Sequence, residues 1–408
     1  MQYTITAPKS VKGCIVLPAS KSISNRALTI NSLSGSNIPP SNISDCDDTR
    51  VMCEWMEERP LTVDIGAAGT AMRFSTALLA VTEGKHVITG SERMKNRPIA
   101  VLVDALRQLG AHIEYVEKTG FPPLEITGNP DIEGGRISLP GDISSQYISA
   151  LLMIGPKLSD GLTLELTGSI VSRPYINMTL AIMKEFGACA AWTTDNIIEV
   201  KAGGYSPREY FVENDWSAAS YWYEMVALID NMDAEILLPN LFKESMQGDS
   251  KGTELFRRLG VETAYSQEGV LLRKSGKVTD RLDYDFVDIP DLAQTFTVTC
   301  CMLGIPFHFK GLQSLKIKET DRINALKVEM RKLGYVLEDR NDSELIWQGQ
   351  RCEPENDVAI DTYEDHRMAM AFAPAAIKTR RLRINNPQVV SKSYPHFWED
   401  LRSVGFSI

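Results

Sequence analysis

The sequence predicts an α/β protein with two domains, each built from repeated strand–helix units. Its 408 residues are too many for one hydrophobic core and suit two domains of ordinary size. A strand, a polar turn and a helix that ends in an apolar residue plus Gly recur along the chain. These helix ends are Leu109-Gly110, Phe186-Gly187, Leu259-Gly260, Leu333-Gly334 and Val404-Gly405. Their spacing of about 71 to 77 residues is too regular for chance.

The unit starts also match each other. Thr89-Gly90-Ser91 leads to Arg97-Pro98, and Thr167-Gly168-Ser169 leads to Arg173-Pro174. Extrapolation by one unit places a first copy around residues 47–58, so six α/β units are expected, three in each lobe. Pro98, Pro174 and Thr320 are predicted to open helices. The apolar stripes of these helices are predicted core: Ile99, Leu102, Val103, Leu106, Leu109, Met178, Ile182, Phe186, Ile323, Leu326, Met330 and Leu333.

The crossovers between lobes are predicted near Ser20 and near the midpoint of the chain. Residues 20–213 then form one lobe of three units, of which the first is shortened. Residues 1–19 and 214–408 form the second lobe, also of three units. The segment Val212–Ala219 marks the midpoint because a new run of units starts there.

Composition and charge exclude several classes of protein. The net charge of -10 disfavours non-specific binding to nucleic acid or to anionic membranes. Residues 1–10 lack the apolar core of a signal peptide, and the longest apolar stretch, near residues 298–307, is too short to span a bilayer. The seven cysteines and five histidines have no metal-ligand spacing. A cytoplasmic protein with no metal and no cofactor is expected.

The stretch Leu17–Leu28 carries the first candidate site. Three serines, Lys21 and Arg26 directly precede an apolar run, which indicates a helix N-terminus capped by Ser22 or Ser24. Free N–H groups and the helix dipole favour an anion there, and Arg26 supplies a fork suited to carboxylate or phosphate. A well-capped surface helix is the plainer alternative.

Similar polar turns follow in the first lobe. Small residues in Gly66–Arg73 allow close approach of backbone N–H groups to a ligand, although a plain tight turn explains them too. Arg97 is the best candidate ligand of its turn, since Arg93 and Lys95 suit a solvated edge. Paired hydroxyls at two further helix starts either cap those helices or bind phosphate. They belong to the stretches Ser144-Ser145-Gln146 and Ser172-Arg173-Pro174-Tyr175.

In the second lobe Asp291 precedes an apolar helix and is either its cap or a functional acid. Cations at helix starts oppose the dipole unless an anion lies nearby. Seven cations are predicted at helix starts: Lys21, Arg26, Arg97, Lys318, Arg322, Arg367 and Lys392. After subtraction of Asp291 and Glu319 about five positive charges remain. If the two lobes face each other, this charge matches a pair of phosphorylated carboxylic acids, and the two acids become proton-transfer candidates.

Nine strings in this order resemble the 5-enolpyruvylshikimate-3-phosphate synthase family over essentially the whole chain. They are PASKSISNRA, GAAGTAMR, RMKNRPI, SSQY, SRPY, IPD, KIKETDR, YEDHRMAM and SKSYP. The resemblance implies two domains, each an inside-out α/β barrel, built together from six βαβαββ units, with the active site in the interdomain cleft. It implies transfer of the enolpyruvyl group of phosphoenolpyruvate to the 5-hydroxyl of shikimate 3-phosphate, with release of phosphate, by a monomer without a cofactor.

The resemblance also implies site residues. The family's shikimate 3-phosphate site corresponds to Lys21, Ser22, Arg26, Ser144, Ser145, Gln146, Ser172, Tyr175, Asp291, Ser314 and Lys318. Its phosphoenolpyruvate site corresponds to Lys21, Gly69, Arg97, Gln146, Arg322, Arg367 and Lys392. The catalytic roles fall to Asp291 as base toward the hydroxyl, Glu319 as proton donor and acceptor, and Lys21 as assistant to either.

The chain departs from the family pattern in three places. Ala67 and Ser314 stand where Asn is usual, and the segment between Asp48 and Gly66 is about twenty residues shorter than expected. Gly69 is retained, so glyphosate is expected to compete with phosphoenolpyruvate. Three rival interpretations are a UDP-N-acetylglucosamine enolpyruvyl transferase, a non-catalytic repeat protein and an inactive relative. The first needs a cysteine-bearing loop, and no cysteine lies between Cys53 and Cys189.

Overall fold

The computed structural model describes residues 1–408, apart from the side chain of Ile317. The chain divides into two compact units. Unit 1 comprises Met1–Pro18 and Asn214–Ile408, and unit 2 comprises Ala19–Glu213. At the crossovers, Ser20 N donates to Glu213 O within unit 2, and Asp215 N donates to Pro18 O within unit 1, each at 2.9 Å. The two segments that connect the units, around Ser20 and around Asp215, therefore lie side by side.

Unit 2 contains two four-stranded sheets. The first has the order β3 (Thr62–Asp64), β4 (Gly84–Thr89), β6 (Leu124–Gly128), β5 (His112–Tyr115). The second has the order β7 (Gly135–Pro140), β8 (Leu162–Thr167), β10 (Ile197–Val200), β9 (Ala190–Trp192). The helices are α1 (Lys21–Ser34), α2 (Asp47–Glu58), α3 (Gly69–Ala80), α4 (Glu92–Lys95), α5 (Ala100–Gln108), α6 (Ser145–Ile154) and α7 (Arg173–Glu185).

Unit 1 contains three sheets. Two are four-stranded: β12 (Leu259–Tyr265), β13 (Gly269–Val278), β11 (Glu235–Pro239), β2 (Lys12–Cys14); and β14 (Leu282–Asp285), β15 (Phe307–Lys310), β17 (Glu344–Trp347), β16 (Glu338–Arg340). The third is β1 (Gln2–Thr6), β19 (Arg381–Asn385), β18 (Ala359–Ile360). The helices are α8 (Trp216–Leu228), α9 (Gly252–Arg258), α10 (Ala293–Leu303), α11 (Arg322–Lys332), α12 (His366–Phe372), α13 (Ala376–Thr379) and α14 (Phe397–Ser403).

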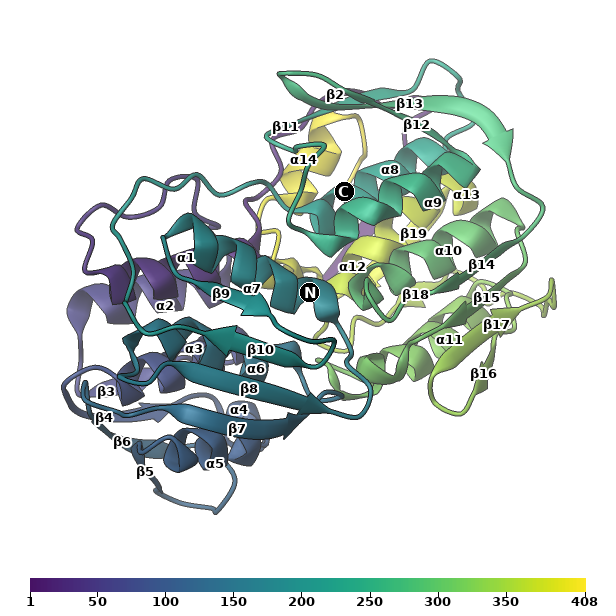
Figure 1. The fold of residues 1–408 in the computed structure, drawn as a ribbon. Coiled ribbons are helices and arrows are strands. Elements are labelled where there is room, and N and C mark those ends of the chain that lie inside the picture. The colour runs from purple at the N-terminus through teal and green to yellow at the C-terminus, as the bar shows by residue number, and fades with distance from the viewer. The chain divides into compact units, whose positions relative to one another are not determined.

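The four-stranded sheets share one pairing pattern, which Figure 1 allows the reader to follow. In three of them the first two strands are parallel, as in β3/β4 and β14/β15, and are joined through a helix. The last two strands of these three sheets pair antiparallel as a hairpin. In the fourth sheet the parallel pair is β2/β11 and the antiparallel hairpin is β12/β13. Right-handed crossovers with a helix are the usual route between neighbouring parallel strands. The α/β class predicted from the sequence is confirmed.

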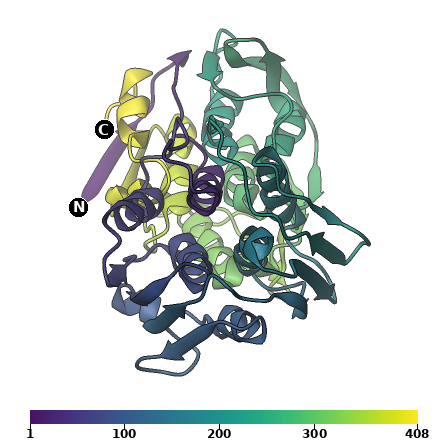
Figure 2. The same ribbon diagram turned by 60° about the vertical axis from the view of Figure 1, so that its left-hand side comes forward.

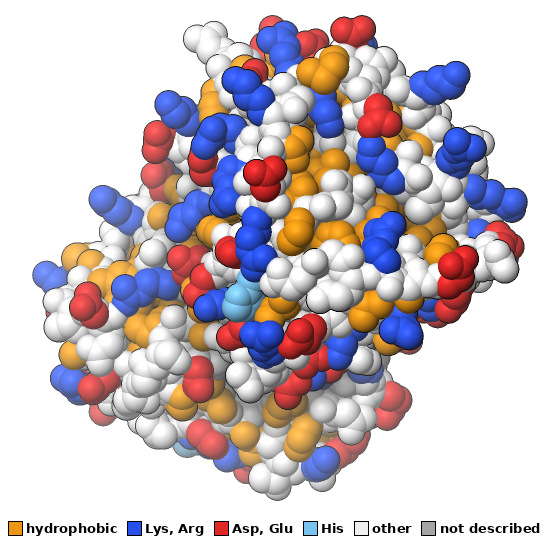
Figure 3. Space-filling model, turned by 90° about the vertical axis from the view of Figure 1, so that its right-hand side faces the viewer, with side chains coloured by type: hydrophobic (Ala, Val, Ile, Leu, Met, Phe, Trp, Pro, Cys, Tyr) orange, Lys and Arg blue, Asp and Glu red, His pale blue; other side chains and the backbone are white. Residues whose placement is uncertain are grey.

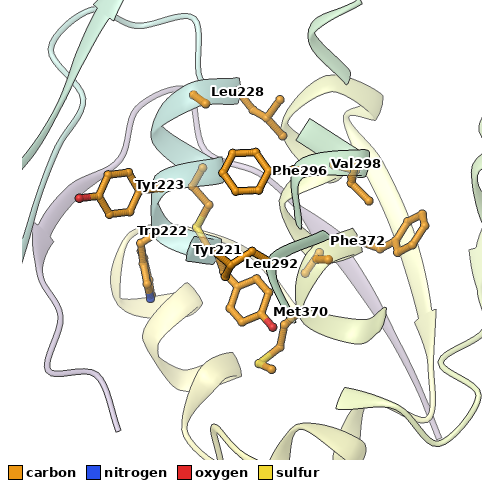
Figure 4. Packing of buried hydrophobic residues seen from close by; sticks show 14 of the residues in the cluster. Tyr221, Trp222, Tyr223, Leu228, Leu292, Phe296, Val298, Met370 and Phe372 are labelled. Atoms are coloured by element: carbon orange, nitrogen blue, oxygen red, sulfur yellow. The ribbon is translucent and has the colours of Figure 1, made fainter. Parts of the chain in front are cut away.

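The core of unit 1 lies among its parallel-running helices. Figure 4 shows aromatic and aliphatic side chains of α8, α10 and α12 packed together, among them Tyr221, Phe296 and Met370. Phe256 of α9 joins them, with its ring centroid 4.4 Å from that of Phe296. The helical stripes predicted from the sequence, such as Leu326 and Met330 of α11, are buried.

The two ends of the chain meet in unit 1. Figure 2 shows the purple N-terminal strand beside the yellow C-terminal segment, and β1 pairs antiparallel with β19. On the face drawn in Figure 3, basic and acidic side chains alternate instead of forming a field of one sign. Among the described helices, none combines the length and the apolar character needed to cross a bilayer.

Candidate active site

Four helices of unit 2 start at the same end of that unit. Arg26 of α1 donates to Ser149 of α6 at 3.0 Å and to Thr179 of α7 at 2.7 Å. Gln146 of α6 donates to Thr70 of α3 at 3.0 Å. Each contact joins residues in the first two turns of its helices, so the helices run parallel with their N-termini together. Free N–H groups and positive dipole ends therefore gather at one place.

The first of these N-termini differs in detail from the prediction. Helix α1 begins at Lys21, and its cap is Ser20, whose side chain accepts from Ile23 N at 3.4 Å. Ser22 and Ser24 lie inside the helix and are not caps, because the helix begins earlier than the apolar run suggested. Lys21 Nζ lies 3.8 Å from Asp48 Oδ2, and both side chains keep some exposure to solvent.

Arg26 is almost completely buried, at 2% exposure. Its guanidinium donates to the hydroxyls of Thr179 and Ser149 and to the carbonyl of Ser22 at 2.8 Å. Burial lowers the pKa of Arg26 to about 10. No acidic side chain forms an ion pair with it among the described residues. A buried cation that lacks a protein carboxylate is a natural partner for an anionic ligand.

Gly69 opens α3 beside two guanidinium groups. A Cβ atom added at Gly69 would lie 2.6 Å from Nη1 of Arg97 and 2.8 Å from Nη1 of Arg73. Arg73 is 5% exposed and donates to Gly69 O at 2.8 Å, and its own guanidinium lies over the Tyr147 ring. Arg97 follows α4 and precedes α5, which begins at Ala100, so neither Arg97 nor Pro98 opens a helix as predicted. The absence of a side chain at Gly69 makes room for these cations.

The remaining candidates of unit 2 lie at the starts of α6 and α7. Ser144 caps α6 and accepts from Gln146 N at 3.4 Å, and Ser145 is the first helical residue. Ser172 precedes α7 with a left-handed backbone, φ 54°, and makes no side-chain cap, so its hydroxyl is not used by the helix. Tyr175 follows in the first turn of α7, and its carbonyl accepts from Thr179 at 2.9 Å. The candidates Lys21, Gly69, Ser144, Ser145, Gln146, Ser172 and Tyr175 thus lie in the first turns of these four helices or directly before them.

Arg322 is the centre of the candidates in unit 1. It is 1% exposed and is the first residue of α11, whose cap is Asp321, not Thr320 as predicted. Its guanidinium reaches three carboxylates: Asp365 Oδ2 at 2.7 Å, Glu319 Oε2 at 2.8 Å and Asp291 Oδ1 at 3.1 Å. Burial alone would lower the pKa of Arg322, but these carboxylates outweigh burial and raise it.

Asp291 joins Arg322 to a second guanidinium. It lies in a short 3₁₀ turn (Pro290–Leu292) before α10, and its side chain does not cap that helix. Its Oδ2 accepts from Arg367 Nη2 at 2.9 Å, and Lys318 Nζ lies 3.9 Å from its Oδ1. Asp291 is therefore held among three cations, and its carboxylate is a candidate proton acceptor.

Two further candidates of unit 1 are Lys392 and Ser314. Lys392 ends a 3₁₀ helix (Pro387–Lys392) instead of starting a helix, and its Nζ donates to Glu364 O at 2.8 Å. Ser314 lies in the 3₁₀ segment Gln313–Ile317. Among the described residues, Ser314 makes no hydrogen bond with the Arg322 group.

Two carboxylates of unit 1 were missed by the sequence analysis. Asp365 is fully buried, caps α12 through Arg367 N at 2.9 Å and holds Arg322. Asp249, 6% exposed, accepts from the Ser217 hydroxyl, and burial with the nearby charge of Asp291 raises its pKa to about 7. A polar residue before an Ala-Met helix was the available signal for Asp365; Asp249 had none.

These additions change the charge that was expected. The site candidates in unit 1 have four cations and four carboxylates: Lys318, Arg322, Arg367 and Lys392 with Asp249, Asp291, Glu319 and Asp365. In unit 2 Asp48 is the acidic partner of Lys21, while Arg73 joins the cations. Inclusion of Asp48, Asp249, Asp365 and Arg73 lowers the expected sum from about +5 to about +3. The positive surplus belongs to the helix ends of unit 2.

Comparison with known proteins gives consistent matches. The sequence model of one family, EPSP synthase (3-phosphoshikimate 1-carboxyvinyltransferase), matches residues 56–401. A Bacteroides fragilis protein named 3-phosphoshikimate 1-carboxyvinyltransferase is 61% identical over 408 residues, covering 100% of this chain and 99% of that protein. A Shewanella pealeana protein of the same name is 35% identical and covers 99% of both chains.

Solved structures share the fold at lower identity. EPSP synthase from Acinetobacter baumannii superposes with a TM-score of 0.80 at 19% identity, covering 100% of both chains. The enolpyruvyl transferase NikO from Streptomyces tendae superposes with a TM-score of 0.72 at 13% identity, covering 99% of this chain and 97% of that one. At these identities the two structures support only the assignment of the fold.

Proposed function

The chain belongs to the EPSP synthase family, the 3-phosphoshikimate 1-carboxyvinyltransferases (EC 2.5.1.19). We propose that the candidate residues of unit 1 and of unit 2 bind the two substrates of that reaction. The reaction transfers the enolpyruvyl group of phosphoenolpyruvate to the 5-hydroxyl of shikimate 3-phosphate and releases phosphate, in the shikimate pathway. For the fold we propose an inside-out α/β barrel in each unit, built from six βαβαββ repeats in the whole chain.

Shikimate 3-phosphate is bound mainly by unit 2. The buried guanidinium of Arg26, which has no acidic partner among the described residues, supports a role with Ser22 in holding the ring carboxylate. The hydroxyls at the starts of α6 and α7 suit the phosphate, because a helix N-terminus offers N–H groups to an anion. Residues proposed for this substrate are Lys21, Ser22, Arg26, Ser144, Ser145, Gln146, Ser172, Tyr175, Asp291, Ser314 and Lys318.

Phosphoenolpyruvate is bound by cations of both units. The close packing of Arg97 on Gly69 and the pair of guanidinium groups on Asp291 support this assignment. Arg groups bind carboxylate and phosphate through two parallel hydrogen bonds, which fixes orientation as well as charge. Residues proposed for this substrate are Lys21, Gly69, Arg97, Gln146, Arg322, Arg367 and Lys392.

The catalytic proposal rests on the two carboxylates, Asp291 and Glu319, that bind the guanidinium of Arg322. Asp291 accepts the proton of the 5-hydroxyl as its oxygen attacks C2 of phosphoenolpyruvate, while Glu319 delivers a proton to C3. The tetrahedral adduct then loses phosphate as the C3 proton returns to Glu319 and the double bond forms again. Arg322 holds both carboxylates at known positions, Asp291 at 3.1 Å and Glu319 at 2.8 Å. Lys21 assists either transfer.

The test is phosphate release with both substrates, with each omitted, and with UDP-N-acetylglucosamine in place of shikimate 3-phosphate. Release should require both native substrates. Glu319→Gln should lose turnover by on the order of 10²-fold or more while substrate affinity changes little. Glu338→Gln, an exposed Glu paired with Arg340 in the same unit, is the matched control. Normal turnover of Glu319→Gln would remove Glu319 from the mechanism. We further propose that the protein is a cytoplasmic monomer. Sedimentation of the purified protein checks the oligomeric state.

A further inference from the structure

The turn before α12 has an unusual backbone. Tyr363 and Glu364 have φ values of 53° and 56°, so two consecutive residues occupy the left-handed region. The other such pair of non-glycine residues in the described chain, Asn341 and Asp342, lies in the hairpin between β16 and β17 and consists of residue types that tolerate this region. A Tyr followed by Glu does not tolerate it easily, and such strain persists only where the surroundings hold it.

The side chain of Glu329 holds this turn. Glu329 lies on α11 and is fully buried. Its Oε1 accepts from the Tyr363 hydroxyl at 2.6 Å, and its Oε2 accepts from Asp361 N at 3.1 Å, while Lys332 Nζ lies 2.8 Å away and balances the charge. Burial and the Glu329 carboxylate raise the pKa of Tyr363, so its hydroxyl stays a donor at neutral pH. One carboxylate thus fixes two points of the turn.

The turn contacts three cationic residues of the candidate site: the side chains of Arg322 and Lys392 and the backbone of Arg367. Asp365 N donates to Thr362 O at 2.8 Å, which closes the turn and places the Asp365 carboxylate against Arg322 and the backbone of Arg367. The carbonyl of Glu364, aimed by the left-handed backbone, accepts from Lys392 Nζ at 2.8 Å. A relaxed turn would rotate that carbonyl away and shift Asp365.

We infer that Glu329 and Tyr363 are positioning residues for phosphoenolpyruvate binding, which hold the strained 361–365 turn and through it Arg322, Arg367 and Lys392. The inference rests on the proposed assignment of these cations to phosphoenolpyruvate. Shikimate 3-phosphate, assigned mainly to unit 2, should be affected less.

The test compares Tyr363→Phe with the wild type in steady-state kinetics. Loss of one hydrogen bond to a charged acceptor should raise the KM for phosphoenolpyruvate by about tenfold. The dissociation constant of shikimate 3-phosphate should change by less than about twofold. Tyr223→Phe is the matched control, because it removes a hydroxyl that contacts Thr263 at 3.0 Å elsewhere in unit 1. An unchanged KM in Tyr363→Phe, or an equal rise in Tyr223→Phe, would overturn the inference.

A rescue variant separates positioning from general damage. Glu364→Asn introduces a residue that accepts the left-handed region, so the turn should hold its shape without the Tyr363 hydroxyl. The double variant Tyr363→Phe/Glu364→Asn should recover a KM within about twofold of the wild type. A KM that stays raised in the double variant contradicts the role of backbone strain.

Lys392→Met in the same assay distinguishes this inference from the proposed function. A raised KM for phosphoenolpyruvate in Lys392→Met, with no effect of Tyr363→Phe, would reject the positioning role and leave the site assignment standing. An unchanged KM in Lys392→Met would reject the assignment of Lys392 itself and the inference with it.

Discussion

Asp291 Oδ2 lies 2.9 Å from Nη2 of Arg367, and the backbone carbonyl of Asp291 lies 3.4 Å from Nη1 of the same guanidinium. The carboxylate and the carbonyl together align Arg367 against the start of α10. Arg367 is also within 3.5 Å of the Tyr221 hydroxyl, whose pKa burial raises. A cation fixed on two sides by protein acceptors presents its remaining N–H groups in a set direction. Binding of an anion then requires little reorganisation.

Asp291→Asn should abolish most turnover, because the amide cannot accept the proton of the 5-hydroxyl. A loss on the order of 10²–10⁴-fold in kcat is expected, with a smaller change in the KM for either substrate. Pre-steady-state mixing with both substrates measures the step. Asp233→Asn, which changes an exposed Asp of the same unit, should behave as the wild type. Wild-type kcat in Asp291→Asn would leave the base unassigned.

Gly69→Ala should weaken phosphoenolpyruvate binding selectively. The new Cβ would lie 2.6 Å from Arg97 Nη1, so the guanidinium must move. Displacement of a binding group by about 1 Å costs on the order of 10²-fold in kcat/KM. Steady-state kinetics should show the loss in the KM for phosphoenolpyruvate, while calorimetric titration gives nearly unchanged shikimate 3-phosphate affinity. Equal weakening of both substrates would mean that Gly69 supports the whole helix end.

Asp249→Asn should change how stability depends on pH. Burial raises the folded-state pKa of Asp249 to about 7, above the unfolded value near 4. A raised carboxyl pKa gives stability that is complete below the unfolded value and lost as the pH rises through the folded value. The Tm of the wild type should therefore fall relative to that of Asp249→Asn between pH 5 and 8. Thermal unfolding across this range measures the difference. A constant difference would mean that Asp249 ionises normally.

Glu224→Gln should stabilise the protein at higher pH. Glu224 of α8 is fully buried, and neither carboxyl oxygen has a hydrogen bond partner among the described residues. The nearby Thr299 hydroxyl donates instead to Thr295 O at 2.7 Å. Burial raises the pKa of Glu224 well above its ordinary value, so stability is lost as the pH rises toward that pKa.

The Tm advantage of Glu224→Gln should accordingly grow from pH 5 to pH 9. Glu268→Gln, on the exposed turn between β12 and β13, should show no such trend. A variant less stable than the wild type at every pH would show that the carboxyl has a structural partner, such as a buried water.

The sequence predicted some helix N-termini of the candidate site correctly, because the start of a helix depends on neighbouring residues in the chain. Helix N-termini at Lys21 and Ser145 were indicated by polar residues before apolar runs, and the structure has α1 and α6 there. Predictions of single caps were less successful. Ser20 and Asp321 cap α1 and α11, because several adjacent residues can cap a helix and packing decides which turn is the first.

The partners of the charged residues could not be predicted. Arg322 and Asp365 are separated by 43 residues, and Arg26 and Thr179 by 153, so their contacts depend on how the helices pack. Asp249 had no sequence signal at all, because its raised pKa results from burial and from the charge of Asp291. The sum of charges was overestimated for the same reason.

The sequence by itself determined the α/β class and the polar starts of α1 and α6, because periodicity and capping are local properties of the chain. Only the tertiary structure decided that α1, α3, α6 and α7 start at the same end of unit 2. It also decided that Arg322 binds three carboxylates and that Glu329 accepts a hydrogen bond from Tyr363. These relationships join residues far apart in the chain, and their strength comes from burial, which no local pattern encodes.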